Sequence, residues 1–154
     1  MNRFQTASLK CKMLRRQRFA PAVGALDAAQ QRLLTRYVEA WELRDVDALV
    51  AMLTEEASFS MPPFPTWFVG RPAITEVLRG RVFADGRKFR LIPTHAGGQP
   101  AFAVYKKEQC EERFEPHGIQ LVWLGTDAIL SVITFQKARL VTAFGLPAEV
   151  ALRG

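Results

Sequence analysis

The sequence has few of the residues on which disulfide frameworks and metal sites depend. Its two cysteines, Cys11 and Cys110, lie far apart and form no CxxC motif. Its two histidines, His95 and His117, have no second metal ligand at helical spacing. Disulfide-rich scaffolds and zinc sites require such residues at regular spacings. We therefore expect reduced thiols, no metal site and no cofactor.

The sequence also lacks a long apolar stretch. No run approaches the ~20 consecutive apolar residues that a membrane-spanning helix needs. The first residues do not combine the apolar core and the small-residue cleavage site of a secretory signal. We therefore expect no membrane contact and a cytoplasmic location.

The positive charge is unevenly distributed along the chain. The formal net charge is +6 at pH 7, yet residues 1–36 alone carry eight Lys and Arg against one acidic residue, Asp27. The rest of the chain is almost neutral and shows no evident phosphate-binding face. The sequence thus predicts a basic leader and linker over residues 1–26, including a short helix, and one folded domain over residues 27–154.

Three helices are predicted at the start of this domain. Asp27 and Gln30 have the spacing of a capping box, and the apolar residues that follow recur every three to four positions. Asp45 is placed to cap a second, shorter helix that extends to Leu53. Pro72, which suits the first turn of a helix, marks the third.

Strand-like segments make up most of the remainder. Residues 57–61 alternate between apolar and polar side chains, and four longer segments follow. Glycine-containing turns at 97–98 and 125–126 join these segments into hairpins, which span residues 88–96, 99–105, 113–124 and 127–136. Helices followed by antiparallel strands are typical of an α+β domain in which a curved sheet wraps around helices.

Several stretches give this order of elements a family resemblance. They include residues 36–41 (Arg-Tyr-Val-Glu-Ala-Trp), 59–63 (Phe-Ser-Met-Pro-Pro) and 98–105 (Gly-Gln-Pro-Ala-Phe-Ala-Val-Tyr). Over residues 27–148 the sequence resembles the SnoaL-like, or nuclear transport factor 2-like, domain appended to extracytoplasmic-function sigma factors. The two DNA-binding domains of such a factor do not precede it here, so we expect this domain to act on its own.

The resemblance implies a fold and three alternative functions. The fold is a cone of three helices enclosed by a curved antiparallel or mixed sheet, often dimeric through the sheet. The first function is noncatalytic and regulatory, with a small apolar ligand bound in the cone. The second is catalysis as an isomerase, dehydratase or cyclase. The third is a dimeric interaction module whose basic leader contacts RNA polymerase or nucleic acid.

The candidate catalytic residue is His95. It shares strand parity with Phe89 and Leu91, and an imidazole titrates close to neutral pH. Enzymes on this fold place a base inside the cone, where an apolar environment tunes its pKa. In this alternative His95 is the general base, and Tyr37 or Gln99 donates a hydrogen bond to a developing oxyanion.

Large side chains are the candidates for lining the cone. Each of them has core packing as its alternative role, since bulky apolar residues usually fill the interior. The predicted ligand-binding residues are Tyr37, Trp41, Phe59, Met61, Phe64, Trp67, His95, Gln99, Phe102, Trp123 and Phe135.

Overall fold

The computed structural model describes residues 26–148. Its first two helices each start at a residue whose side chain caps the helix. Helix α2 (Ala28–Leu43) begins after Asp27, whose carboxylate accepts from the Gln30 backbone N–H at 2.7 Å. The Gln30 side chain in turn accepts from the Asp27 N–H at 3.2 Å. Asp45 caps helix α3 (Val46–Ala51) by accepting from the Ala48 N–H at 3.0 Å. Both predicted helix starts are confirmed.

The third predicted helix continues into less regular turns. Helix α4 (Arg71–Val77) has proline in its first turn, as expected. It runs directly into a π-helical turn, η2 (Leu78–Val82), and then into a 3₁₀ turn, η3 (Ala84–Gly86). Such π-helical turns are often found at functional sites.

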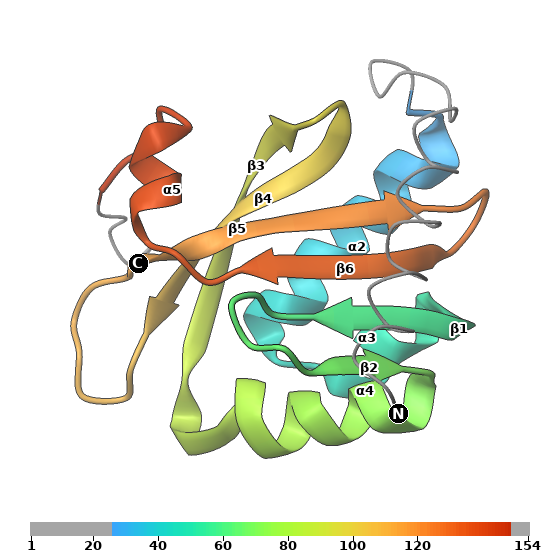
Figure 1. Cartoon of the computed structure of the whole chain (residues 1–154), viewed down its shortest axis with the longest axis horizontal. Helices are drawn as coiled ribbons and strands as arrows, with labels where there is room; N and C mark the ends of the chain where they lie inside the picture. Colours follow the sequence, from blue (N-terminus) through green and yellow to red (C-terminus); the bar gives the residue numbers. More distant parts are fainter. Residues whose placement is uncertain (1–25, 149–154) are drawn as a thin grey trace.

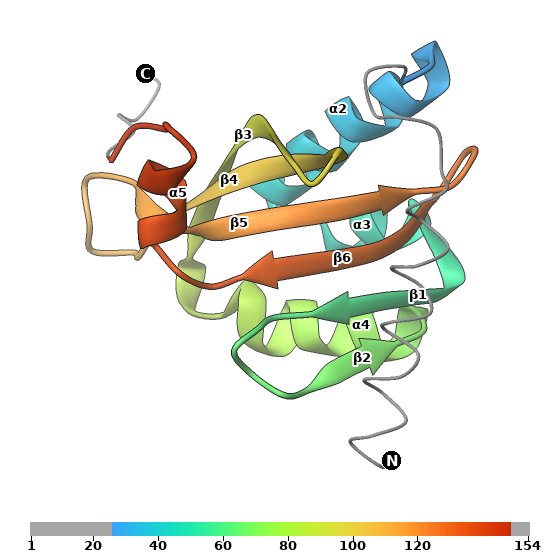
Figure 2. The same cartoon turned by 45° about the horizontal axis from the view of Figure 1, so that its top comes forward.

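One curved sheet wraps around these helices (Figures 1 and 2). Its strand order is β2-β1-β6-β5-β4-β3, with β1 and β6 parallel and all other neighbours antiparallel. The strands are β1 (Leu53–Ser60), β2 (Trp67–Val69), β3 (Lys88–Ala96), β4 (Gln99–Lys107), β5 (Glu115–Leu124) and β6 (Ile129–Phe135). The α+β class, the mixed sheet and both hairpins are confirmed.

Three local features differ from the prediction. Strand β1 begins at Leu53, which the sequence placed on the apolar side of the preceding helix. Leu53 pairs instead with Ile129 of β6, and the Ile129 N–H donates to the Met52 carbonyl at 2.8 Å. The short strand β2 and a fourth helix, α5 (Arg139–Ala143), were not expected. The early start of β1 depends on pairing with β6, which is distant in sequence, whereas β2 pairs locally with β1 across the loop of residues 61–66.

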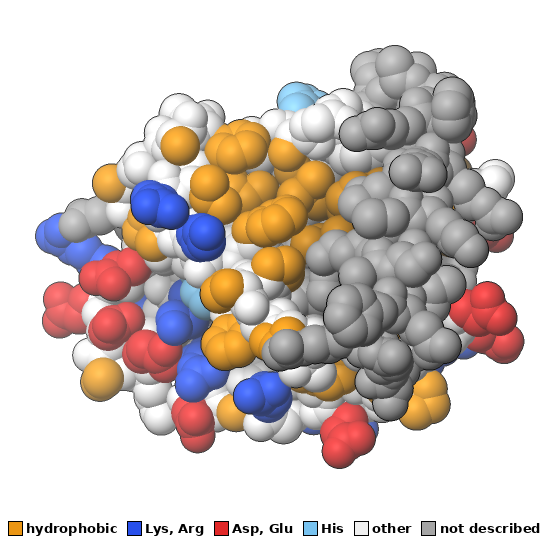
Figure 3. All heavy atoms as spheres, in the orientation of Figure 1, with side chains coloured by type: hydrophobic (Ala, Val, Ile, Leu, Met, Phe, Trp, Pro, Cys, Tyr) orange, Lys and Arg blue, Asp and Glu red, His pale blue; other side chains and the backbone are white. Residues whose placement is uncertain are grey.

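Hydrophobic side chains are buried on both faces of the sheet. On the concave face, α2, α3 and α4 pack with Phe59, Leu91 and Val122 into the larger cluster. On the outer face, Val141 of α5 packs against a smaller cluster that includes Tyr105. Figure 3 looks onto the outer face, where hydrophobic side chains gather over the strands. Helices α2, α3 and α4 therefore cover the concave face, and α5 covers part of the outer face.

Some predictions concern segments beyond the described residues. The basic leader and Cys11 lie there, so the leader and the boundary at residue 26 stay predictions. In the part of the chain that the structure describes, no helix is both long and apolar enough to cross a bilayer. Cys110 is a free, exposed thiol.

Candidate functional site

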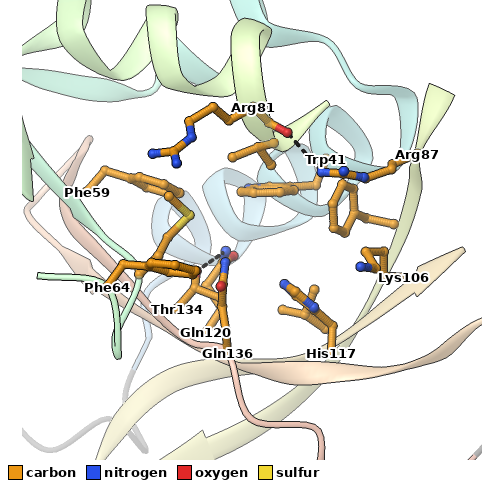
Figure 4. A pocket seen from close by; sticks show the side chains of 14 residues that line it. Trp41, Phe59, Phe64, Arg81, Arg87, Lys106, His117, Gln120, Thr134 and Gln136 are labelled. Atoms are coloured by element: carbon orange, nitrogen blue, oxygen red, sulfur yellow. Dashed lines mark hydrogen bonds between the residues drawn. The ribbon is translucent and has the colours of Figure 1, made fainter. Parts of the chain in front are cut away.

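A cavity of about 260 Å³ lies at one end of the cone (Figure 4). It opens where α2 and η2 meet the ends of β1, β4, β5 and β6. Aromatic and aliphatic side chains form one part of its wall, and polar and cationic side chains form the other. The lining residues are Trp41, Phe59, Met61, Phe64, Arg81, Val82, Arg87, Phe89, Val104, Lys106, His117, Gln120, Thr134 and Gln136.

Trp41 is the centre of the aromatic wall. It projects from α2 and is only 3% exposed. Its ring meets Phe83 edge to face at a centroid distance of 5.0 Å and Phe89 at 5.5 Å. Phe83 and Phe89 also contact each other, at 5.6 Å. Such edge-to-face contacts favour one mutual orientation of the three rings.

A buried hydrogen-bonded chain forms the polar floor. The Tyr37 hydroxyl donates to Gln120 Oε1 at 2.5 Å, and Gln120 Nε2 donates to Thr134 Oγ1 at 2.9 Å. Burial raises the pKa of the Tyr37 hydroxyl well above its ordinary value, so the phenol stays protonated and acts as a donor. These two hydrogen bonds fix the orientation of the Gln120 amide and leave the Thr134 hydroxyl hydrogen available to the cavity.

His117 enters the cavity because of a β-bulge. Tyr105 pairs with Pro116 and Val104 pairs with Gly118, so His117 is an extra residue in β5. Strict alternation from Gln120 would turn His117 to the outer face. The bulge turns it inward instead, and Figure 4 shows its ring pointing into the cavity.

His117 is held in its neutral form. Burial, together with the positive charges of Lys106 and Arg87, lowers the pKa of His117 to about 4, although Glu108 opposes this shift. The imidazole is therefore uncharged at pH 7 and offers one donor and one acceptor.

This pKa predicts a pH dependence of stability. Unfolding returns the His117 pKa to about 6.5. Between about pH 6.5 and about pH 4 the unfolded chain therefore carries a proton on His117 that the folded chain lacks, which favours unfolding. The stabilisation is complete above about pH 6.5 and is lost as the pH falls towards about 4. Urea denaturation measures the free energy of unfolding at each pH. Between about pH 6.5 and about pH 4 we expect this free energy to fall by about 2 kcal/mol less in His117→Gln than in the native chain. An unchanged pH profile in His117→Gln would contradict the assignment.

Three cationic side chains stand at the cavity: Arg81, Arg87 and Lys106. Glu108 lies beside two of them, with Arg87 Nε at 3.3 Å and Lys106 Nζ at 3.0 Å. The hydrogen bond from Lys106 lowers the pKa of Glu108 and keeps its carboxylate ionised. Arg87 also donates to the Arg81 backbone carbonyl at 3.1 Å, which ties the η2 turn to the start of β3.

Six of the predicted site residues lie within the cone. Trp41, Phe59, Met61 and Phe64 line the cavity. Tyr37 and Phe102 lie deeper, with their rings 5.8 Å apart. Tyr37 also lines a small internal void of about 10 Å³ beneath the cavity, so it acts on the cavity through Gln120.

His95 and Gln99 do not line the cavity, contrary to the prediction. His95 pairs with Pro100 near the β3–β4 turn and is exposed, while Gln99 is half-buried beside the same turn. The cavity lies near Phe89, at the other end of β3. His95 is six positions along the strand from Phe89, a distance of about 20 Å. The strand parity of His95 and its place beside the Gly97-Gly98 turn were predicted correctly, but the cavity lies at the opposite end of the strand.

Trp67, Trp123 and Phe135 lie on the outer face of the sheet and not in the cone. Directly paired residues of antiparallel strands share a face. Phe135 pairs with Ile119, which belongs to the outer cluster. Trp67 pairs with Ser60, and Trp123 pairs with Ser131; both serines face outward. Their size suggested the cone, but the sheet buries apolar residues on both faces.

The sequence interpretation missed most of the polar residues of the site. His117 could have been found from Gly118, since glycine within a strand pattern indicates a bulge or a close backbone approach. No local sequence pattern indicated that Arg81 and Lys106 line the same cavity, since they are far apart in sequence. Among the described residues no group of three or more His, Cys, Asp or Glu is arranged to hold a metal ion.

Comparison with known proteins gives consistent results. Residues 34–141 match the family model described as a SnoaL-like domain. The ECF RNA polymerase sigma factor SigG of Mycobacterium tuberculosis is 34% identical over 131 residues, which cover 83% of this chain and 35% of SigG. This chain therefore spans about a third of the length of that relative.

Solved structures share the fold at low sequence identity. A candidate ketosteroid isomerase from Kribbella flavida has a TM-score of 0.59 and 14% identity, covering 71% of this chain and 78% of its own. An NTF2-like protein of unknown function from Mesorhizobium loti has a TM-score of 0.58 and 18% identity, covering 73% and 96%. Likeness at these identities concerns the fold alone.

Proposed function

The chain belongs to the SnoaL-like domain family, and from that premise we propose that it binds a small, largely apolar molecule in its cone and acts as a noncatalytic regulatory domain. The observation that carries this proposal is the cavity of about 260 Å³, with its aromatic wall and a few fixed polar groups. Ligand sites commonly combine an apolar lining with few orienting polar side chains. Family membership by itself names no ligand.

The protonation states at the site favour binding over acid–base catalysis. A general base works best when its pKa is close to the working pH. His95, the expected base, is exposed and outside the cavity. His117 lies inside, but its pKa of about 4 makes it a weak proton acceptor at neutral pH. An isomerase, dehydratase or cyclase would have to rely on His117 with little basicity.

The regulatory role rests on the similarity to SigG. That relative is named as an RNA polymerase sigma factor, and the matched segment covers most of this chain. We therefore propose that transcription machinery is the partner, through the basic leader or the folded domain. A homodimer through the outer face of the sheet is a further proposal, for which light scattering should give twice the monomer mass of 17.3 kDa.

A neutral aromatic probe tests whether the cavity binds ligands. We expect 2-naphthamide to bind the native chain and quench its tryptophan fluorescence. Phe64 lines the cavity and is 55% exposed, so Phe64→Ala should weaken binding roughly three- to tenfold with little loss of stability. Phe144 is 40% exposed and does not line the cavity. Phe144→Ala is thus the matched control, and it should bind like the native chain.

Two outcomes would contradict the proposed function. The first is a native chain that binds neither 2-naphthamide nor the corresponding acid, 2-naphthoate. The second is an equal loss of affinity in Phe64→Ala and Phe144→Ala, which would place the probe on apolar surface outside the cone. Isothermal titration calorimetry gives the same affinities without relying on tryptophan.

A further inference from the structure

The cations at the cavity are unequally paired with acidic residues. Arg87 and Lys106 share the carboxylate of Glu108, and Asp85 lies 3.7 Å from Arg87. Within residues 26–148, by contrast, no carboxylate forms an ion pair with Arg81. The guanidinium of Arg81 therefore gives the site a positive charge that no acidic side chain of the described residues pairs with.

Arg81 is positioned beside the aromatic wall. Figure 4 shows its side chain extending across the cavity towards Phe59, with Gln136 and His117 on the opposite side. Its backbone is anchored through the hydrogen bond from Arg87. An acidic group on Arg81 would therefore leave the rest of the same molecule against Phe59 and Trp41.

These contacts specify the chemistry of a ligand. A guanidinium binds a carboxylate through two parallel hydrogen bonds, a geometry that also fixes orientation. One unpaired cation suits a single negative charge better than a doubly charged phosphate. Rigid aromatic side chains favour a flat ring, since rings stack or meet edge to face. The volume of about 260 Å³ lies slightly below the usual range of ~300–1,000 Å³ for ligand pockets, so the molecule is small.

Building on the ligand-binding function proposed above, we propose that the cavity is selective for small aromatic monocarboxylates, with the carboxylate on Arg81 and the ring between Phe59 and Trp41. Arg87 and Lys106 add longer-range attraction, which Glu108 partly cancels. Gln136 and His117 offer hydrogen bonds to further polar substituents of the ring.

The same π-helical turn supplies a matched control for Arg81. Arg79 is also exposed and belongs to η2, but it forms an ion pair with Asp47 at 2.5 Å and lines a different surface hollow. Removing either positive charge changes the net charge of the chain by the same amount. Only the removal of Arg81 should affect a carboxylate in the cone.

The test compares 2-naphthoate with its neutral counterpart 2-naphthamide by titration calorimetry at low salt. We expect the native chain and Arg79→Gln to bind the acid about five- to tenfold more tightly than the amide. Arg81→Gln should reduce this preference to about twofold while the affinity for the amide stays unchanged. Circular dichroism should show that all three chains are equally folded.

The outcomes separate the two proposals. Equal affinities for acid and amide in the native chain, or the same preference in Arg81→Gln and Arg79→Gln, would overturn the carboxylate selectivity and leave the ligand-binding function standing. Binding of neither probe to the native chain would overturn both.

Discussion

Gly118→Ala should lower the free energy of unfolding by about 3 kcal/mol or more. A Cβ atom at this position would lie 1.9 Å from the Phe135 carbonyl oxygen and 2.9 Å from the Phe135 carbonyl carbon. Both atoms belong to the backbone of β6, which is paired with β5 on one side and with β1 on the other. The clash therefore cannot be relieved by a side-chain rotation, and the central strands would have to separate.

The substitution should also disturb the candidate site. Gly118 lies at the bulge that turns His117 into the cavity, so moving β5 away from β6 would also displace His117 and Gln120. Chemical denaturation measures the stability loss, and titration with 2-naphthamide measures the loss of binding.

Gly80→Ala is the control for this substitution. A Cβ atom at Gly80 would have no neighbour within 4 Å, and alanine suits a helical turn better than glycine. Its stability should match or slightly exceed that of the native chain. Equal stability of Gly118→Ala and Gly80→Ala would contradict the close approach of β5 and β6 at Gly118.

Trp41→Ala should cost about 3–5 kcal/mol of folding free energy. The indole is 3% exposed and contacts Phe83 and Phe89 edge to face, with Tyr37 at 6.2 Å. Removing it would join the cavity at the end of the cone to the small internal void, since Trp41 lines both. The surrounding rings belong to Tyr37 on α2, Phe83 between η2 and η3, and Phe89 on β3. Each is held by a different backbone segment, so we expect them to fill the space only in part.

Two further variants make this prediction specific. Trp41→Phe keeps an aromatic ring and should lose clearly less stability than Trp41→Ala. Leu43, at the end of the same helix, is 76% exposed, so Leu43→Ala should change stability by no more than about 0.5 kcal/mol. Thermal and urea denaturation of the four chains give the comparison. A loss below about 1 kcal/mol in Trp41→Ala would mean that the aromatic wall is loosely packed.

The site residues that the sequence predicted share one property. Trp41, Phe59, Met61 and Phe64 are apolar and belong to segments whose inward face follows from local periodicity or from the loop after β1. Burial of large apolar side chains is favoured wherever the sheet and helices meet, so the location of Trp41, Phe59 and Met61 needs no detailed register. Phe64 stays 55% exposed and reaches the cavity from the loop. Trp123 and Phe135 show the limit of this reasoning, because bulk alone does not say which face of a sheet a residue occupies.

The polar half of the site could not be predicted in the same way. Arg81 and Lys106 are 25 positions apart, yet both line the cavity. Lys106 is placed there by the register of β3 and β4, which puts it opposite Phe89, and Arg81 comes from the η2 turn. His117 faces the cavity only because of one extra residue in β5. A shift of a single residue moves a side chain to the other face of the sheet. Positions of this kind depend on pairing between distant segments.

The sequence by itself determined where α2 and α3 begin, where the two hairpins turn, the α+β class and the family. The helix starts, the hairpin turns and the α+β class follow from neighbouring residues, namely caps, glycine turns and apolar periods, whose interactions form within a few residues of chain. The family was indicated instead by the resemblance of stretches such as residues 59–63 and 98–105 to SnoaL-like domains. Only the tertiary structure decided that His117 lies in the cavity, that His95 lies about 20 Å away along β3, and that Arg81 stands without an acidic partner in the described chain. The physical reason is that strand register, bulges and ion pairing are set by contacts between residues far apart in sequence, which local periodicity does not encode.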